Sequence, residues 1–132
     1  MAGASHFREL DCWQLANQLK RALYALSRRE PVVHDFRFAD QVRDAAASAP
    51  RNIAEGFGRR THKEFAHFLD IARGSLTECQ NHLIDSVDRG YLTTEEAGEL
   101  MTLSNRALGA LAGLQRHLRN TPDPLSRVRR RG

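Results

Sequence analysis

Two short stretches of the chain carry residue types that could hold a metal ion. Glu64 and His67 have the spacing of the Glu-x-x-His element found in di-iron helical bundles. Glu78, Cys79 and His82 fall on one helical face and could bind zinc together. The di-iron site needs a second such element and two more glutamates, however, and the zinc cluster has no matching cluster elsewhere in the sequence. We therefore predict no metal site, no cofactor and no catalytic residue.

A second set of polar residues lies around one predicted turn and comprises Asn52, Glu55, Arg59 and Glu78. Their side chains could form hydrogen bonds and ion pairs with one another across a helical hairpin. We interpret them as a polar network that locks the hairpin or a subunit interface. A ligand-binding or catalytic site is the alternative.

Helices must position all of these side chains. Apolar residues recur at intervals of three and four, and no segment shows sustained strand-like alternation. The spacing predicts an all-α chain with four helices over about 11–29, 35–57, 62–88 and 94–119. The short connections between them predict an up-down-up-down antiparallel four-helix bundle. We expect one domain over residues 1–119, followed by a basic, flexible and disordered tail over residues 120–132.

The strongest local signal is the junction between the second and third helices. Gly56 stands where the second helix ends, and Thr61 with Glu64 forms a capping-box pattern that begins the third. Asp11 is the predicted N-cap of the first helix, and Thr93 begins a second capping box before the fourth. These signals place the helix ends within a residue or two.

Small residues predict where the second and third helices come closest. Gly74 and Ser75 lie in the middle of the third helix, and folding the hairpin sets Gly74 level with Ala45. A glycine inside a helix costs about 1 kcal/mol relative to alanine, so it usually has a packing reason. We expect the two backbones to touch at this level and Gly74→Leu to disrupt them. Trp13 is expected to remain outside the core and to anchor one subunit to another.

The composition excludes several classes of protein. The chain has 132 residues and a hydrophobic share of 41%, and no apolar run approaches the roughly 18 residues that span a bilayer. Its first residues carry no hydrophobic segment typical of a signal peptide. Two cysteines, Cys12 and Cys79, are too few for a disulfide scaffold and fall on apolar stripes. We expect a cytoplasmic protein without a membrane partner.

The net charge of +4 is unevenly placed along the chain. Residues 1–118 carry equal numbers of basic and acidic side chains, so the excess begins at Arg119. In an up-down-up-down bundle the start of the first helix, the second turn and the end of the fourth helix share one end. That end collects eleven basic against five acidic side chains, whereas the opposite end is acidic.

We predict that this end contacts RNA or DNA phosphates, with a solvated surface as the alternative. Free N–H groups at the start of the third helix are expected to help bind the anion. The predicted contact residues are Arg51, Arg59, Arg60, Lys63, Arg116, Arg119, Arg127, Arg129, Arg130 and Arg131.

These motifs also resemble a known family over roughly residues 7–118. They read Phe7-Arg-Glu-Leu-x-x-Trp13-Gln-x-Ala16, Ser48-x-x-x-Asn52-Ile-Ala-Glu-Gly-x-Gly-Arg59 and Phe65-x-x-Phe68-Leu-x-Ile-Ala-x-Gly-Ser75-x-x-Glu78. The chain is similar to the four-helix-bundle proteins encoded by intervening sequences in bacterial 23S ribosomal RNA genes. It also resembles the related accessory variability proteins of diversity-generating retroelements. The resemblance implies a homopentameric ring without known enzymatic activity, and its retroelement branch binds nucleic acid.

Three functional hypotheses follow from the sequence. The first is a non-enzymatic, ring-forming oligomer that binds RNA or DNA through its basic end. The second is a protein–protein adaptor or scaffold with no nucleic-acid role, for which the tail would dock an acidic partner. The third is a hydrolytic or metal-assisted enzyme that uses Glu55, Glu78 or His82. No feature of the sequence indicates a small-molecule substrate, and we rank the hypotheses in this order.

Overall fold

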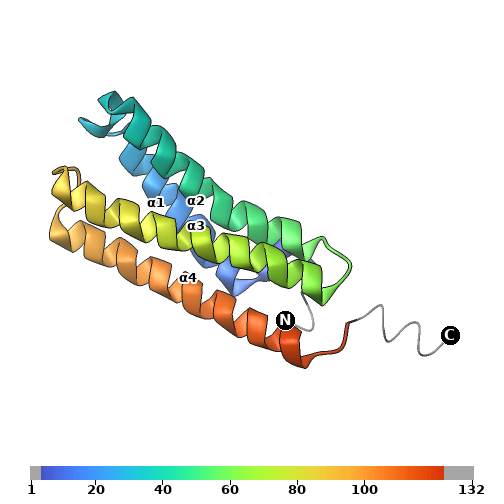
Figure 1. The fold of residues 1–132 in the computed structure, drawn as a ribbon. Coiled ribbons are helices and arrows are strands. Elements are labelled where there is room, and N and C mark those ends of the chain that lie inside the picture. Colours follow the sequence, from blue (N-terminus) through green and yellow to red (C-terminus); the bar gives the residue numbers. More distant parts are fainter. Residues whose placement is uncertain (1–3, 124–132) are drawn as a thin grey trace.

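A computed structural model of the chain describes residues 4–123. Every element of regular secondary structure over that range is a helix. Its four long helices form the bundle in Figure 1. They are α1 (Asp11–Arg28), α2 (Phe36–Phe57), α3 (His62–Asp88) and α4 (Thr94–Asn120). Every bound lies within one residue of its predicted position, so the all-α four-helix fold is confirmed. Two short 3-10 helices, η1 (Phe7–Glu9) and η2 (Val32–His34), were not predicted.

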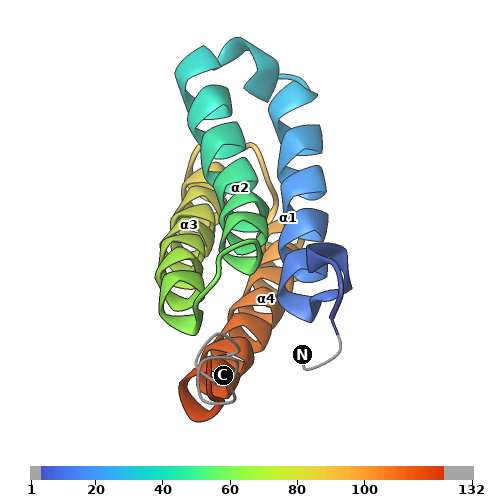
Figure 2. The same cartoon turned by 90° about the vertical axis from the view of Figure 1, so that its right-hand side faces the viewer.

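Each helix packs against two neighbours in a closed order. α2 contacts α1 and α3, and α4 contacts α3 and α1. Figure 2, turned by 90° from Figure 1, shows α3, α2 and α1 side by side with α4 behind and below them. Leucines and small apolar residues from every helix fill the interior of the bundle, including the fully buried Leu19, Ile53, Leu76 and Leu111. Burial of each large apolar side chain contributes roughly 1.5–3 kcal/mol, and this packing holds the helix ends in place.

The start of α1 differs from the prediction. Asp11 is the first helical residue, and the N-cap position belongs to Leu10, which makes no capping hydrogen bond with its side chain. Leu10 is only 1% exposed, because η1 turns the chain so that this leucine enters the core. Burial of Leu10, rather than capping by Asp11, therefore sets where α1 begins.

The two predicted capping boxes have different outcomes. Thr93 begins α4 with a complete box, in which Glu96 N–H donates to the threonine hydroxyl and the Glu96 carboxylate accepts from the Thr93 N–H. Thr61 begins α3 with half of one: its hydroxyl accepts from the Glu64 N–H at 3.1 Å, and its hydroxyl also lies 3.2 Å from the Glu64 carboxylate. Both threonines begin their helices as predicted.

The close approach of α2 and α3 lies at a different glycine from the one predicted. Gly74 is exposed, and a Cβ atom added there meets nothing within 4 Å, so the predicted contact at this residue is wrong. A Cβ at Gly56 lies 2.8 Å from Phe65 Cδ1 and 2.9 Å from Phe68 Cβ. The register explains the error: Ser75 is the residue that faces α2, which turns Gly74 toward solvent.

Candidate nucleic-acid interface

The antiparallel topology brings the start of α1, the α2–α3 turn and the end of α4 to the same end of the bundle (Figure 1). We call this the basic end. Its described cations are Arg8, Arg51, Arg59, Arg60, Lys63, Arg116 and Arg119. The five acidic residues counted in the sequence are all described, whereas Arg127, Arg129, Arg130 and Arg131 lie outside the described residues. The basic excess of the described part is therefore smaller than that of the whole chain.

Most of the described cations at the basic end form no ion pair with another described residue. Arg59 is the exception, since its guanidinium donates to Glu55 at 2.8 Å and lies over the Phe68 ring at 4.7 Å from the centroid. Arg8 also forms no ion pair, but its side chain donates to His6 at 3.4 Å. Within residues 4–123, the other five exposed cations form no ion pair and can meet an external anion. They are Arg51, Arg60, Lys63, Arg116 and Arg119.

At the opposite end of the bundle Arg29 and Arg89 form internal ion pairs, whereas Arg28 and Arg37 form none within the described residues. Arg89 donates to Asp35 at 2.9 Å and to Asp85 at 2.8 Å, and its guanidinium also lies over the Phe38 ring. The Tyr91 hydroxyl donates to Asp35 at 2.6 Å. This bond, together with Arg89, holds the pKa of Asp35 below its ordinary value, and the same bond raises the pKa of Tyr91.

A second ion pair at that end joins α1 to α4. Arg29 donates to Glu96 at 3.1 Å and also to the Tyr91 carbonyl oxygen. Hydrogen bonds from Arg29, and then from the Thr93 N–H, lower the pKa of Glu96 to about 2. Arg29 and Arg89 thus stabilise turns, whereas the five cations of the basic end make no such ion pair within residues 4–123.

The start of α3 is not the free anion site that the sequence predicted. The His62 N–H donates to the Asp123 carboxylate at 3.0 Å, and the Glu64 N–H donates to Thr61. His62 Nδ1 also lies 3.1 Å from the Thr121 carbonyl oxygen. The chain leaves α4 and crosses the first turn of α3, so its own carboxylate occupies part of the position expected for an external phosphate.

The predicted polar network near the α2–α3 turn is divided into separate contacts. Ser75 contacts Ser48 of α2 at 2.6 Å between hydroxyl oxygens, and Asn52 donates to the Ser48 carbonyl oxygen at 2.8 Å. These groups link α2 to α3 at the level of Ser75. Glu55 pairs with Arg59 on its own side of the turn. Ser75 thus contacts α2, Asn52 bonds within α2, and Glu55 pairs with Arg59 at the helix end, whereas a role of these residues in a subunit interface stays a prediction.

Glu78 lies apart from this group. It belongs to the middle of α3, where its carboxylate is 3.4 Å from His82 Nε2 without hydrogen-bond geometry. Cys79 is fully buried, and burial raises its pKa to about 12, so it points away from the exposed Glu78. Residues 4–123 contain no group of three or more His, Cys, Asp or Glu side chains placed to hold a metal ion.

Trp13 packs against residues of the same chain. Its ring meets Phe7 edge-on, with 5.3 Å between centroids, and it is half-buried against the core. It also lines a shallow groove of about 290 Å³ with Tyr24 and Pro50, between α1 and α2. A further role of Trp13 between subunits stays a prediction.

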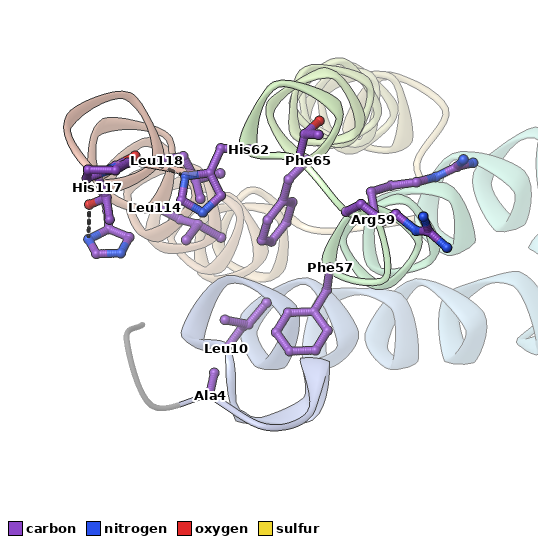
Figure 3. Close-up of a pocket in the computed structure, with 13 residues that line it drawn as sticks. Ala4, Leu10, Phe57, Arg59, His62, Phe65, Leu114, His117 and Leu118 are labelled. Atoms are coloured by element: carbon purple, nitrogen blue, oxygen red, sulfur yellow. Dashed lines mark hydrogen bonds between the residues drawn. The ribbon is translucent and has the colours of Figure 1, made fainter. Parts of the chain in front are cut away.

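The basic end also contains a cavity of about 350 Å³ that sequence reasoning missed. Figure 3 shows its apolar walls, which come from the segment before α1 and from α2, α3 and α4. The apolar lining residues are Ala4, Leu10, Phe57, Phe65, Leu114 and Leu118. Two phenylalanines that flank the turn were the only sequence signal, and residues from four distant segments could not be assigned to one cavity without the fold.

These features define an antiparallel four-helix bundle with a hollow, cationic end. The chain belongs to the 23S rRNA-intervening sequence protein family, whose model matches residues 8–113. The match includes Arg51, Arg59, Arg60 and Lys63 but ends before Arg116. The family description names no reaction. Comparison with curated proteins gave no match. Among the described residues, no helix has the length and apolar character needed to cross a membrane.

Proposed function

We propose that the protein is a non-enzymatic, ring-forming oligomer that binds RNA or DNA through its basic end. The observation that carries this proposal is the contrast between the two ends of the bundle. Six of the seven described cations at the basic end have no ion pair within the described residues, whereas at the other end Arg29 and Arg89 are held by carboxylates and only Arg28 and Arg37 are unpaired. Unpaired cations on one surface attract a polyanion, because each phosphate that they neutralise releases a condensed counterion.

The family description refers to a ribosomal RNA sequence and assigns no binding partner, so the support comes from the surface itself. The resemblance to nucleic-acid-binding accessory variability proteins points the same way and stays a prediction. A cytoplasmic location belongs to this proposal, because a bacterial protein meets RNA and DNA there.

Oligomerisation, with a homopentamer as the expected state, is the second part of the proposal. Ile71 and Ile84 on α3 are 40% and 56% exposed, which is unusual for large apolar side chains. Ile84 also lines an apolar groove with Val87 and Met101, between α3 and α4. Neighbouring subunits that cover this side of the bundle would repeat the basic end around one axis and multiply its positive potential.

Fluorescence anisotropy with short RNA and DNA strands over a salt series tests the binding. Arg60→Ala should weaken binding and reduce the slope of log affinity against log salt by roughly 0.7–0.9 for each phosphate that the variant no longer neutralises. Arg28→Ala is the matched control, since Arg28 is exposed and unpaired within the described chain but lies at the opposite end. A version ending at Asp123 retains the contacts to His62 and isolates the contribution of the remaining arginines.

Light scattering on the same samples gives the mass of the assembly. A monomer at working concentrations would refute the ring. Equal weakening by Arg60→Ala and Arg28→Ala would refute the basic end as the binding surface. Absence of binding at low salt in every form would remove the nucleic-acid role altogether.

A further inference from the structure

The cavity at the basic end has an apolar interior. Leu10, just before α1, lies opposite Leu114 and Leu118 of α4, with Phe57 beside Leu10 and Phe65 extending from α3 (Figure 3). Its volume of about 350 Å³ lies within the roughly 300–1,000 Å³ range of small-molecule sites. It can therefore receive a single planar group but not a folded segment of nucleic acid.

Two aromatic rings in this interior favour the binding of a planar ligand. The Phe57 and Phe65 centroids are 6.2 Å apart, and their planes meet at 87°. An aromatic guest beside such a pair stacks on the face of one ring and meets the edge of the other, and both arrangements are favourable. Phe57 is the last residue of α2, which leaves its ring only partly buried.

The rim of the cavity is polar and mainly cationic, although the Asp123 carboxylate accepts from the His62 N–H beside it. His62 and His117 line it, as does Arg60, which has no ion pair within the described chain. Lys63 follows His62 in the sequence, and Arg116 and Arg119 are near neighbours of His117 on α4. Arg59 also lines the cavity, although its guanidinium donates to Glu55 and lies over the Phe68 ring.

An apolar, aromatic interior below a cationic rim is complementary to a ligand that has a planar ring and an attached anionic group. We infer that the cavity receives one unpaired nucleobase of the bound strand, while the flanking phosphates stay outside near Arg60, Lys63 and Arg119. This inference rests on the proposed nucleic-acid binding and adds a preference to it. A base in a duplex must be unpaired and unstacked before it can enter, so single strands should bind more tightly than duplexes of the same sequence.

The test uses the full-length protein and a short single strand that carries one 2-aminopurine, whose emission responds to stacking. The same strand annealed to its complement is the duplex probe. Binding followed by anisotropy should be at least about fivefold tighter for the single strand, as expected from stacking of one base on an aromatic side chain. The 2-aminopurine emission should change in step with the anisotropy of the single strand.

Two substitutions examine the cavity without altering its charge. Phe57→Leu removes a stacking ring from a partly buried helix end, and Ala4→Leu narrows the cavity from a segment outside the helices. Each should abolish the emission change and weaken single-strand binding about fivefold or more, with little effect on the duplex. Phe36→Leu is the matched control, because Phe36 is 73% exposed at the opposite end of α2.

The outcomes separate this inference from the proposal on which it rests. Equal affinity for both probes, with Phe57→Leu behaving like Phe36→Leu, would refute base insertion and leave binding by the basic end intact. No binding of either probe at low salt would refute both. Saturable binding of a free nucleoside monophosphate without binding of the strand would identify a nucleotide site and overturn the inference for nucleic acid.

Discussion

Replacing Gly56 with alanine tests how closely α2 and α3 approach. The added Cβ would lie 2.8 Å from Phe65 Cδ1, 2.9 Å from Phe68 Cβ and 3.2 Å from the Phe65 carbonyl oxygen. The Phe65 ring could rotate to relieve the first contact. The other two atoms are backbone or directly attached to it, so α3 itself must move by several tenths of an ångström.

The size of the effect follows from two opposing terms. Overpacking a well-filled interface typically costs 1–3 kcal/mol, and contacts with backbone favour the upper part of that range. Alanine gains at most about 1 kcal/mol over glycine in helix propensity, and less in the last turn, where Gly56 lies. We expect a net destabilisation of about 2 kcal/mol, which corresponds to a fall in Tm of roughly 5–10 °C for a chain of this size.

Gly74→Ala supplies a control with the opposite expected sign. Gly74 is exposed inside α3, and no atom lies within 4 Å of the position of the new Cβ. The helix propensity of alanine should therefore stabilise the protein by up to about 1 kcal/mol. Thermal unfolding of both variants should be followed at one fixed protein concentration, because assembly makes Tm depend on concentration. A Gly56→Ala protein as stable as the wild type would refute the close approach.

Two further predictions concern titratable groups. Arg29 and the Thr93 N–H lower the pKa of Glu96 from 4.5 to about 2. The contribution of ionised Glu96 to the stability of the folded protein is therefore present above about pH 4.5 and disappears as the pH falls to 2. Urea unfolding of Glu96→Gln should thus show lower stability than wild type at pH 7 and no difference near pH 2, and a difference that persists at pH 2 would contradict the mechanism. Burial raises the pKa of Cys12 and of Cys79 to about 12, so neither thiol should react with a maleimide at pH 7.5 until denaturant unfolds the chain. Rapid labelling of the native protein would show that these thiols are accessible.

Local patterns were sufficient for the helices. The three- and four-residue spacing of apolar side chains, together with Thr61 and Thr93, placed every helix within one residue, because periodicity and capping act between residues close in sequence. Short connections then fixed the antiparallel order. Asp11 failed as a predicted cap because burial of Leu10, a tertiary effect, decided where α1 begins.

The contacts of individual side chains could be assigned only from the three-dimensional structure. Sequence reasoning paired Gly74 with Ala45 for the close contact, but Ser75 meets Ser48 and the tight contact lies at Gly56. Glu78 was grouped with Asn52 because both belong to the motifs that carry the family resemblance, near one predicted turn, yet Glu78 contacts His82 on its own helix.

By itself the sequence determined the four helices, their antiparallel order and the charge difference between the two ends, since each depends on residue type and spacing along the chain. Only the tertiary structure decided that Arg29 pairs with Glu96 and Arg89 with Asp35, because these two pairs join segments that are distant in the sequence. It also placed Asp123 on the first turn of α3 and left a cavity below the cationic rim. Both features depend on how the ends of four helices meet, and helix periodicity does not specify that geometry.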